Sequence, residues 1–148
     1  MTTHFSAIRI ISLLISILGL ATIYLFQHFN YLNFFTELFN GNPKDYHPNF
    51  VFAFNRITRF VFNDLLAILL IYAIFIQRKY VMMGFIVQLI GLFIVLPVYL
   101  YIKLSLEGDS EISSPLLSFV HRIVIHPIMV LLLIPAFYYQ ESKQKDQS

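Results

Sequence analysis

Three residues of the last long apolar segment recur every four positions and carry groups suited to binding an anion. Ser118, Arg122 and His126 therefore share one face of a helix. An arginine near the middle of a membrane helix costs about 3 kcal/mol to insert unless it meets a partner or water. We expect this face to look toward other helices or toward the membrane surface.

A second polar group lies at the start of the second apolar segment. Arg56, Arg59 and Asn63 fall within one narrow helical stripe, with Asp64 to one side of it. Asp64 is too deep for its short side chain to reach the membrane surface, so it needs a partner. Arg122 would lie at a similar depth, because its helix starts on the same side of the membrane, and an arginine–carboxylate pair would then satisfy both groups.

These two groups make up the predicted site, which would bind an anionic group or contact a partner's membrane helix. The alternative is that the cluster only fixes how the helices pack. The predicted site residues are Arg56, Arg59, Asn63, Asp64, Arg122 and His126.

Composition identifies the elements that must position this site as membrane helices. The chain has 148 residues, of which 58% are hydrophobic and 12% are charged, whereas soluble domains carry about 25% charged residues. The mean hydropathy is +0.73. These values predict an integral membrane protein.

Four apolar segments are each long enough to cross a hydrocarbon core of about 30 Å. The first could be a cleaved signal peptide, but its length and the later segments favour an uncleaved helix. We therefore predict an all-α, four-helix membrane bundle forming one domain (1–148), with a flexible polar tail at 141–148. The predicted spans are residues 8–26, 57–76, 80–102 and 116–139.

Small residues and prolines predict where these helices pack closely or bend. One stripe of small residues lies on the first span and a small–polar–small stripe on the third, and both permit close approach of a neighbour. The alternative for the first stripe is ordinary serines whose hydroxyls bond back to their own helix. Prolines are expected to bend the third span at Pro97 and the fourth beside His126. The two stripes are Ser12, Ser16 and Gly19, and Gly84, Gln88 and Gly91.

The segment between the first two spans is unusually aromatic. Phenylalanine and tyrosine alternate with polar residues in its first half, which favours a short helix lying in the headgroup region. Gly41 to Asp45 then predict a turn. The segment is either a connector that follows the membrane surface or a docking surface for another membrane protein.

Several function classes lack support. The net charge is only +2 with scattered basic residues, which argues against nucleic-acid binding, and there is no cysteine for a thiolate site. His121 and His126 are five positions apart, so they do not form a four-residue metal pair. We expect no enzyme activity, no cofactor and no metal.

Two blocks of the chain resemble a known family. Residues 55–75 (NRITRFVFNDLLAILLIYAIF) and 121–140 (HRIVIHPIMVLLLIPAFYYQ) are similar to the exosortase F system-associated membrane proteins of flavobacteria and related Bacteroidota. The likeness rests on the N-R-x-x-R-x-x-x-N-D block and the R-x-x-x-x-P…P-A-F-Y-Y-Q ending.

This resemblance implies an accessory role in a system that sorts surface proteins, with exosortase F or another membrane protein as partner. It also implies the bacterial inner membrane as location, and a slight excess of basic residues weakly favours cytoplasmic termini. Exosortases are membrane-embedded cysteine transpeptidases, so a chain without cysteine is not that catalyst. The alternative is a small transporter or a membrane protein that binds an anionic lipid.

Overall fold

The computed structural model describes residues 7–39, 46–106 and 115–145, and all regular structure in these ranges is helical. This confirms the all-α prediction. Along the chain the helices are α1 (Ala7–Leu25), α2 (Tyr31–Leu38), α3 (Pro48–Phe75), α4 (Arg78–Ile90), the π-helical turn η2 (Gly91–Val95), α5 (Leu96–Leu106), α6 (Pro115–Ile125), α7 (Ile128–Leu131) and α8 (Leu133–Lys145).

Three helices are long and apolar enough to cross a membrane, which supports a membrane protein. They are α1, α3 and the continuous helix Arg78–Leu106 formed by α4, η2 and α5. The fourth predicted span is a broken pair, Pro115–Val124 and Ile128–Gln144, bent by 64°. The described chain therefore has three spans, or four if the bent pair counts as one.

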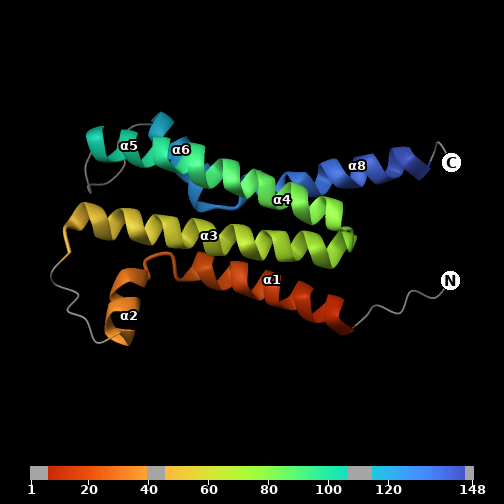
Figure 1. Ribbon diagram of the computed structural model, residues 1–148, viewed down its shortest axis with the longest axis horizontal. Coiled ribbons are helices and arrows are strands. Elements are labelled where there is room, and N and C mark those ends of the chain that lie inside the picture. The colour runs from red at the N-terminus through yellow and green to blue at the C-terminus, as the bar shows by residue number, and fades with distance from the viewer. Residues whose placement is uncertain (1–6, 40–45, 107–114, 146–148) are drawn as a thin grey trace.

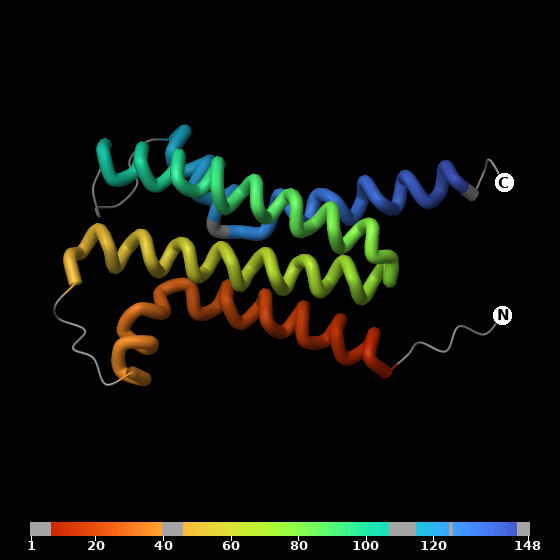
Figure 2. The backbone as a smooth tube through the Cα atoms, in the orientation of Figure 1, coloured from red at the N-terminus to blue at the C-terminus, as the bar shows by residue number. Residues whose placement is uncertain are grey.

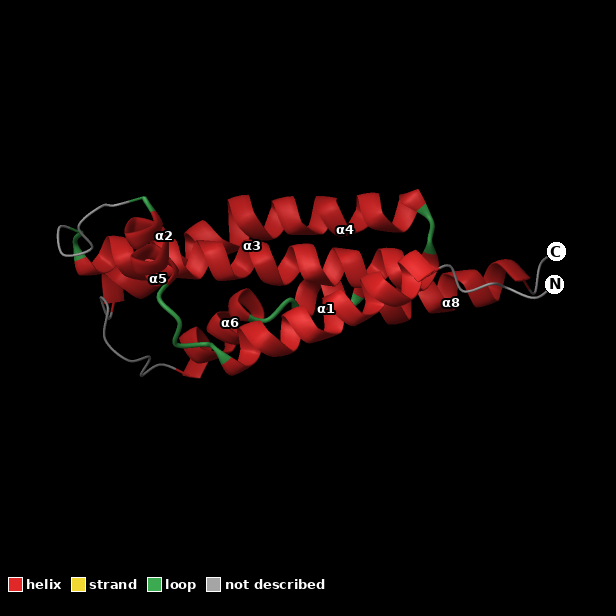
Figure 3. Cartoon of the chain, turned by 90° about the horizontal axis from the view of Figure 1, so that it is seen from below, coloured by secondary structure: helices red, strands yellow, loops and turns green. Residues whose placement is uncertain are grey.

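Helix α3 is the centre of the molecule. It lies between α1 on one side and α4 with α5 on the other, and α6 to α8 pack beside them (Figures 1 and 3). The start of α1 and the end of α8 lie at one end of the bundle, which we call the terminal end (Figure 2). The opposite end, called the far end, gathers α2, the start of α3 and the end of α5.

The two predicted stripes of small residues pack against α3. On α1, Ser16 is fully buried and Gly19 faces Leu66 so closely that an added Cβ would lie 2.8 Å from its methyl carbons. On the other side, a Cβ added to Gly91 would lie 2.6 Å from Cζ of Phe60. The predicted close packing is confirmed, and small residues are what allow it.

Pro97 changes the helix type without ending the helix. A proline has no N–H to donate and crowds the carbonyl of Phe93 four residues earlier. The N–H of Leu96 bonds instead to the carbonyl of Gly91, which is the wider π-helical spacing. The helix then continues to Leu106, so Lys103, just beyond the predicted span 80–102, lies on α5.

The segment between the first two spans contains the predicted short helix, α2. Its N-cap is Asn30, whose Oδ1 accepts from the backbone N–H of Asn33 at 3.1 Å. Asn55 of α3 holds the start of α2, because its Oδ1 accepts from Leu32 N–H at 3.0 Å and its Nδ2 donates to Asn30 Oδ1 at 3.0 Å. The predicted turn at 41–45 lies outside the described residues.

Helix α3 begins earlier than predicted and α8 ends later. Pro48 occupies the first turn of α3 and His47 caps it, so residues 48–56 are helical rather than a connector. Helix α8 continues to Lys145, which makes the first residues of the expected flexible tail helical. Residues 146–148 lie outside the described part of the chain.

Candidate functional site

Hydrogen bonds from two arginines fix how far α1 extends along α3. Near the terminal end, Arg9 donates from Nε to the carbonyl of Ala73 at 3.2 Å and from Nη2 to that of Ile74 at 3.0 Å. Toward the far end, Arg59 donates from Nη2 to the carbonyl of Gln27, just after α1 has ended. Arg59 therefore lies at the depth where the first span ends.

This arrangement places Arg59 near the boundary of the hydrocarbon. Helix α1 has 19 residues and α3 has 28 residues. At 1.5 Å per residue these correspond to about 28 Å and about 42 Å, against a hydrocarbon core of about 30 Å. The first turns of α3 thus extend beyond α1, and we infer that Arg56 and Arg59 lie near the headgroup level.

Arg59 is a buried cation with an unpaired buried donor among the described residues. Its side chain is only 5% exposed, and its buried Nε has no hydrogen-bond partner among the described residues. A guanidinium has five N–H donors, and the bond to Gln27 uses one of them. A buried charge of this kind is strongly unfavourable unless an opposite charge approaches it.

Arg59 opens into a cationic hollow of about 250 Å³, which we call the Arg–His cavity. Its lining brings together three guanidinium and three imidazole groups, which come from α3, from α6 and from the residues that follow α1 and α6. Among the described residues the lining contains no carboxylate. The lining residues are Gln27, His28, Arg56, Arg59, His121, Arg122 and His126.

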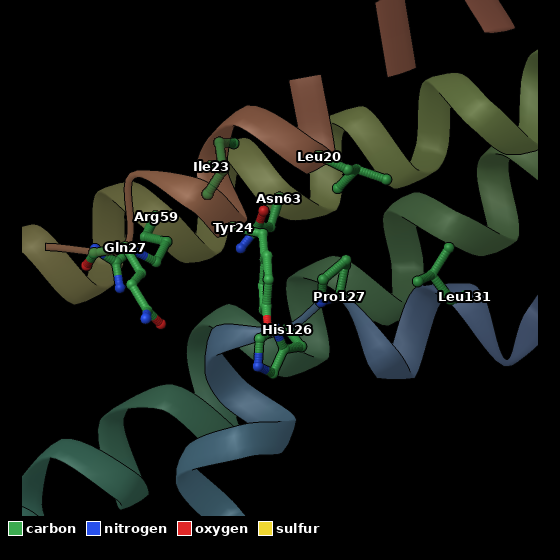
Figure 4. A pocket seen from close by; sticks show the side chains of 9 residues that line it. All are labelled: Leu20, Ile23, Tyr24, Gln27, Arg59, Asn63, His126, Pro127 and Leu131. Atoms are coloured by element: carbon green, nitrogen blue, oxygen red, sulfur yellow. The ribbon is translucent and has the colours of Figure 1, made fainter. Parts of the chain in front are cut away.

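A second hollow of about 200 Å³, the apolar arm, lies next to the Arg–His cavity and runs between α1 and the break in the last span. Figure 4 shows Arg59 and Gln27 at one end of it, Leu20 and Leu131 toward the other, and Tyr24 reaching toward His126. The lining residues are Leu20, Ile23, Tyr24, Gln27, Arg59, Asn63, His126, Pro127 and Leu131, of which Gln27, Arg59 and His126 line both hollows.

The break between α6 and α7 positions His126 at this junction. Pro127 has no N–H, and the N–H of Ile128 bonds to the carbonyl of His126 at 2.7 Å, so the chain leaves the α-helical path. The resulting 64° bend confirms the bend predicted beside His126. The imidazole then lies 6.0 Å from the ring of Tyr24, centroid to centroid.

Aromatic side chains of α3 and α5 contact cations and one imidazole at the Arg–His cavity. The guanidinium carbon of Arg56 is 5.0 Å and Nζ of Lys103 is 5.8 Å from the centre of the Phe52 ring, distances typical of cation–π contacts. Lys103 is 1% exposed. The hydroxyl of Tyr99 is hydrogen-bonded to Nδ1 of His121, which links α5 to α6.

The structure brings together most of the predicted site. Arg56, Arg59, Arg122 and His126 line the Arg–His cavity, and Asn63 lines the apolar arm. Asp64 lines neither hollow.

The expected ion pair between Asp64 and Arg122 is not formed. Asp64 is 3% exposed within the bundle, whereas Arg122 is exposed at the cavity. One residue along a helix turns a side chain by about 100°. The carboxylate of Asp64 is therefore on a different face of α3 from the amide of Asn63.

Several site residues were not predicted. Gln27, His28, Tyr24 and His121 line the hollows, and Lys103 lies behind them. His121 directly precedes Arg122 and Lys103 is in the last turn of α5, and a polar residue in an apolar segment is the signal that could have found them. Among the described residues, no group of three histidine, cysteine or acidic side chains could hold a metal.

Comparison of the chain with protein-family models, with curated proteins and with solved structures finds no match in any of the three.

Proposed function

We propose that this chain is a non-catalytic accessory membrane protein of an exosortase F sorting system, which binds an anionic group of its partner at the Arg–His cavity. The partner would be the exosortase or the membrane anchor of a surface protein that it processes. The link to exosortase F comes from the likeness of residues 55–75 and 121–140 to that family. A chain without cysteine would position components and leave transpeptidation to the exosortase.

The observation that carries this proposal is the state of Arg59. Its guanidinium is buried, its Nε is unpaired among the described residues, and it opens into a cavity lined by further cations. An anion in the cavity would complete its hydrogen bonds and offset the cost of burying the charge. An anion-binding contact is thus favoured over a role in helix packing alone.

The proposal includes a four-helix arrangement in the bacterial inner membrane with cytoplasmic termini. The bent pair α6 to α8 would make the fourth crossing, and a broken helix is tolerated in a membrane where it lines a cavity. With four crossings the Arg–His cavity would face the periplasmic side, where α2 would lie along the headgroups as the aromatic interfacial segment between helices 1 and 2.

The proposal is tested by co-purification from cells that also make the exosortase. The tagged chain is extracted in mild detergent as wild type, Arg122→Ala and Arg78→Ala, the last being an exposed arginine at the terminal end that serves as a charge-matched control. We expect the exosortase with wild type and Arg78→Ala but not with Arg122→Ala. Recovery of the exosortase with all three proteins would exclude the cavity as the contact. Folded wild type recovered without the exosortase would contradict a stable association between the two.

A small transporter or an anionic-lipid-binding protein is the second candidate. The apolar arm favours it, because a contact with a protein side chain needs no hydrophobic extension of the anion site. The two candidates differ in their requirements: a partner contact needs the exosortase, whereas a lipid site binds in a pure bilayer.

A further inference from the structure

We infer that the Arg–His cavity and the apolar arm together hold one phosphate-headed anionic lipid, with the phosphate among the arginines and an acyl chain along the arm. This inference rests on the proposed anion-binding role of the cavity and names the class of ligand. It develops the second candidate above, because the lipid would take the place in the cavity that a partner's anionic group would otherwise fill.

The head end has the chemistry that recognises phosphate. The guanidinium groups of Arg56, Arg59 and Arg122 line one hollow, and guanidinium donors match the oxygens of a phosphate two at a time. Arg59 has an unpaired Nε, and its side chain is more than nine-tenths buried. Three cations around one hollow favour a phosphate, whose oxygens can accept from several of them at once.

The tail end has the chemistry that accepts hydrocarbon. Beyond the shared residues, most of the lining of the apolar arm is aliphatic or aromatic, including Leu20, Ile23 and Leu131. The arm starts at Arg59 and His126, so an apolar chain lying in it would end at the cations. A free phosphate ion would leave this arm without a role.

The depth of the site also fits a lipid. Arg59 is level with the end of α1, near the hydrocarbon boundary, which is where the phosphates of a bilayer lie. The arm extends from that level toward Leu131 of α7, alongside α1. A lipid could thus keep its phosphate at its ordinary depth while one chain enters the protein.

Two other occupants would satisfy the same charges and are distinguished by the test. One is inorganic phosphate, which shares the head-group chemistry but has no chain. The other is the chain's own sequence between α5 and α6, which contains Glu107, Asp109 and Glu111.

The test measures lipid binding by native mass spectrometry of the purified full chain in mild detergent, without exosortase. The probes are dioleoyl phosphatidylglycerol, dioleoyl phosphatidylcholine and inorganic phosphate. We expect one phosphatidylglycerol bound at least about tenfold more tightly than phosphatidylcholine, and competition by inorganic phosphate only at far higher concentration.

Matched variants connect this binding to each end of the site. Arg122→Gln alters an exposed residue of the cavity and should weaken phosphatidylglycerol binding about tenfold, the size expected for one charge-assisted hydrogen bond. Arg78→Gln, at the terminal end, should change it less than twofold. Leu131→Trp should fill the arm and weaken binding. Leu132 is 63% exposed and does not line the arm, so Leu132→Trp should leave binding unchanged.

Four results would overturn the inference. They are equal binding of the two lipids, equal weakening by Arg78→Gln and Arg122→Gln, inorganic phosphate binding as tightly as phosphatidylglycerol, and an increase of more than tenfold on changing Glu107, Asp109 and Glu111 to amides. The last result would identify the chain's own carboxylates as the occupant. Because no exosortase is present, any of these results leaves the co-purification experiment to be decided separately.

Discussion

Arg59 of α3 donates a hydrogen bond to the backbone carbonyl of Gln27, and this contact joins the end of the first span to the lining of the Arg–His cavity. The same guanidinium is buried and has an unpaired Nε among the described residues. It is thus both a tie between α1 and α3 and an incomplete anion site, and these two roles predict different behaviour on mutation.

Replacing Arg59 with methionine separates the two roles. If the arginine is there for an anion, an apolar side chain of similar length should change the free energy of unfolding in lipid-free detergent by less than about 1 kcal/mol, since buried charges are often replaced at little cost. Wild type should gain about 2.7 kcal/mol from phosphatidylglycerol at one hundred times Kd, and Arg59→Met should gain almost nothing. Thermal unfolding with and without lipid measures both. A large loss of stability in lipid-free detergent would show that the tie to Gln27 dominates, and an undiminished gain from lipid in Arg59→Met would contradict the ligand role.

Arg9 is predicted to hold the terminal end of α1 on α3. Its two hydrogen bonds to the carbonyls of Ala73 and Ile74 satisfy the end of α3 with a cation, which the helix dipole also favours. Arg9→Ala should cost about 1–2 kcal/mol, while Arg9→Lys should recover part of this loss. Unfolding in detergent checks the order of the three proteins, and identical midpoints would contradict the assignment.

Gly91 is predicted to be intolerant of a side chain because of Phe60. An alanine Cβ would lie 2.6 Å from Cζ of that ring and 3.3 Å from Cε of Met129. Overpacking of this kind costs about 1–3 kcal/mol. Gly91→Ala should therefore lower the unfolding midpoint, and Phe60→Leu in the same protein should restore part of the loss. A double variant less stable than both single variants would show that the ring is not the cause.

Asn55 is predicted to hold α2 in place. Asn55→Ala removes an acceptor for Leu32 N–H and a donor to Asn30, the N-cap of α2. Loss of these bonds should cost about 1 kcal/mol and act locally. Hydrogen–deuterium exchange should become faster in residues 31–38 and stay unchanged in α4. Asn49→Ala on the same helix is the control, and equal effects of the two would remove the special role of Asn55.

Composition and spacing predicted the membrane class, the packing faces and much of the site because these follow from one-dimensional patterns. The small residues at Ser16 and Gly91 mark close packing wherever the partner helix lies. A proline beside His126 bends a helix regardless of its neighbours. Arg56, Arg59, Arg122 and His126 meet because similar depth from the helix ends is enough to place them at one end of the bundle.

The sequence-based predictions were wrong where a contact depends on more than a residue's depth along its helix. The predicted pair of Asp64 and Arg122 was based on distance along the helices and ignored the direction of each side chain around its helix axis. Asp64 is one position after Asn63, so its carboxylate lies on another face of α3. Lys103 lies just beyond the predicted span 80–102, because the apolar pattern ends at this charged residue, whereas α5 continues to Leu106. The contribution of Tyr24 to the site depends on how α1 packs against the broken helix, which no local pattern specifies.

Site-specific photocrosslinking in living cells tests most directly whether the Arg–His cavity and its apolar arm are occupied. A benzophenone amino acid replaces Tyr24, which lines the apolar arm, and in a matched control replaces Tyr101, which is 75% exposed on α5 and lines neither hollow. If the hollows are occupied, position 24 should form an adduct with a sorting partner or a phosphate-headed lipid. This adduct should be several-fold stronger than the one at position 101 and should be weakened by Arg122→Gln. Equal adducts at both positions, or an adduct at position 24 that Arg122→Gln leaves unchanged, would contradict it.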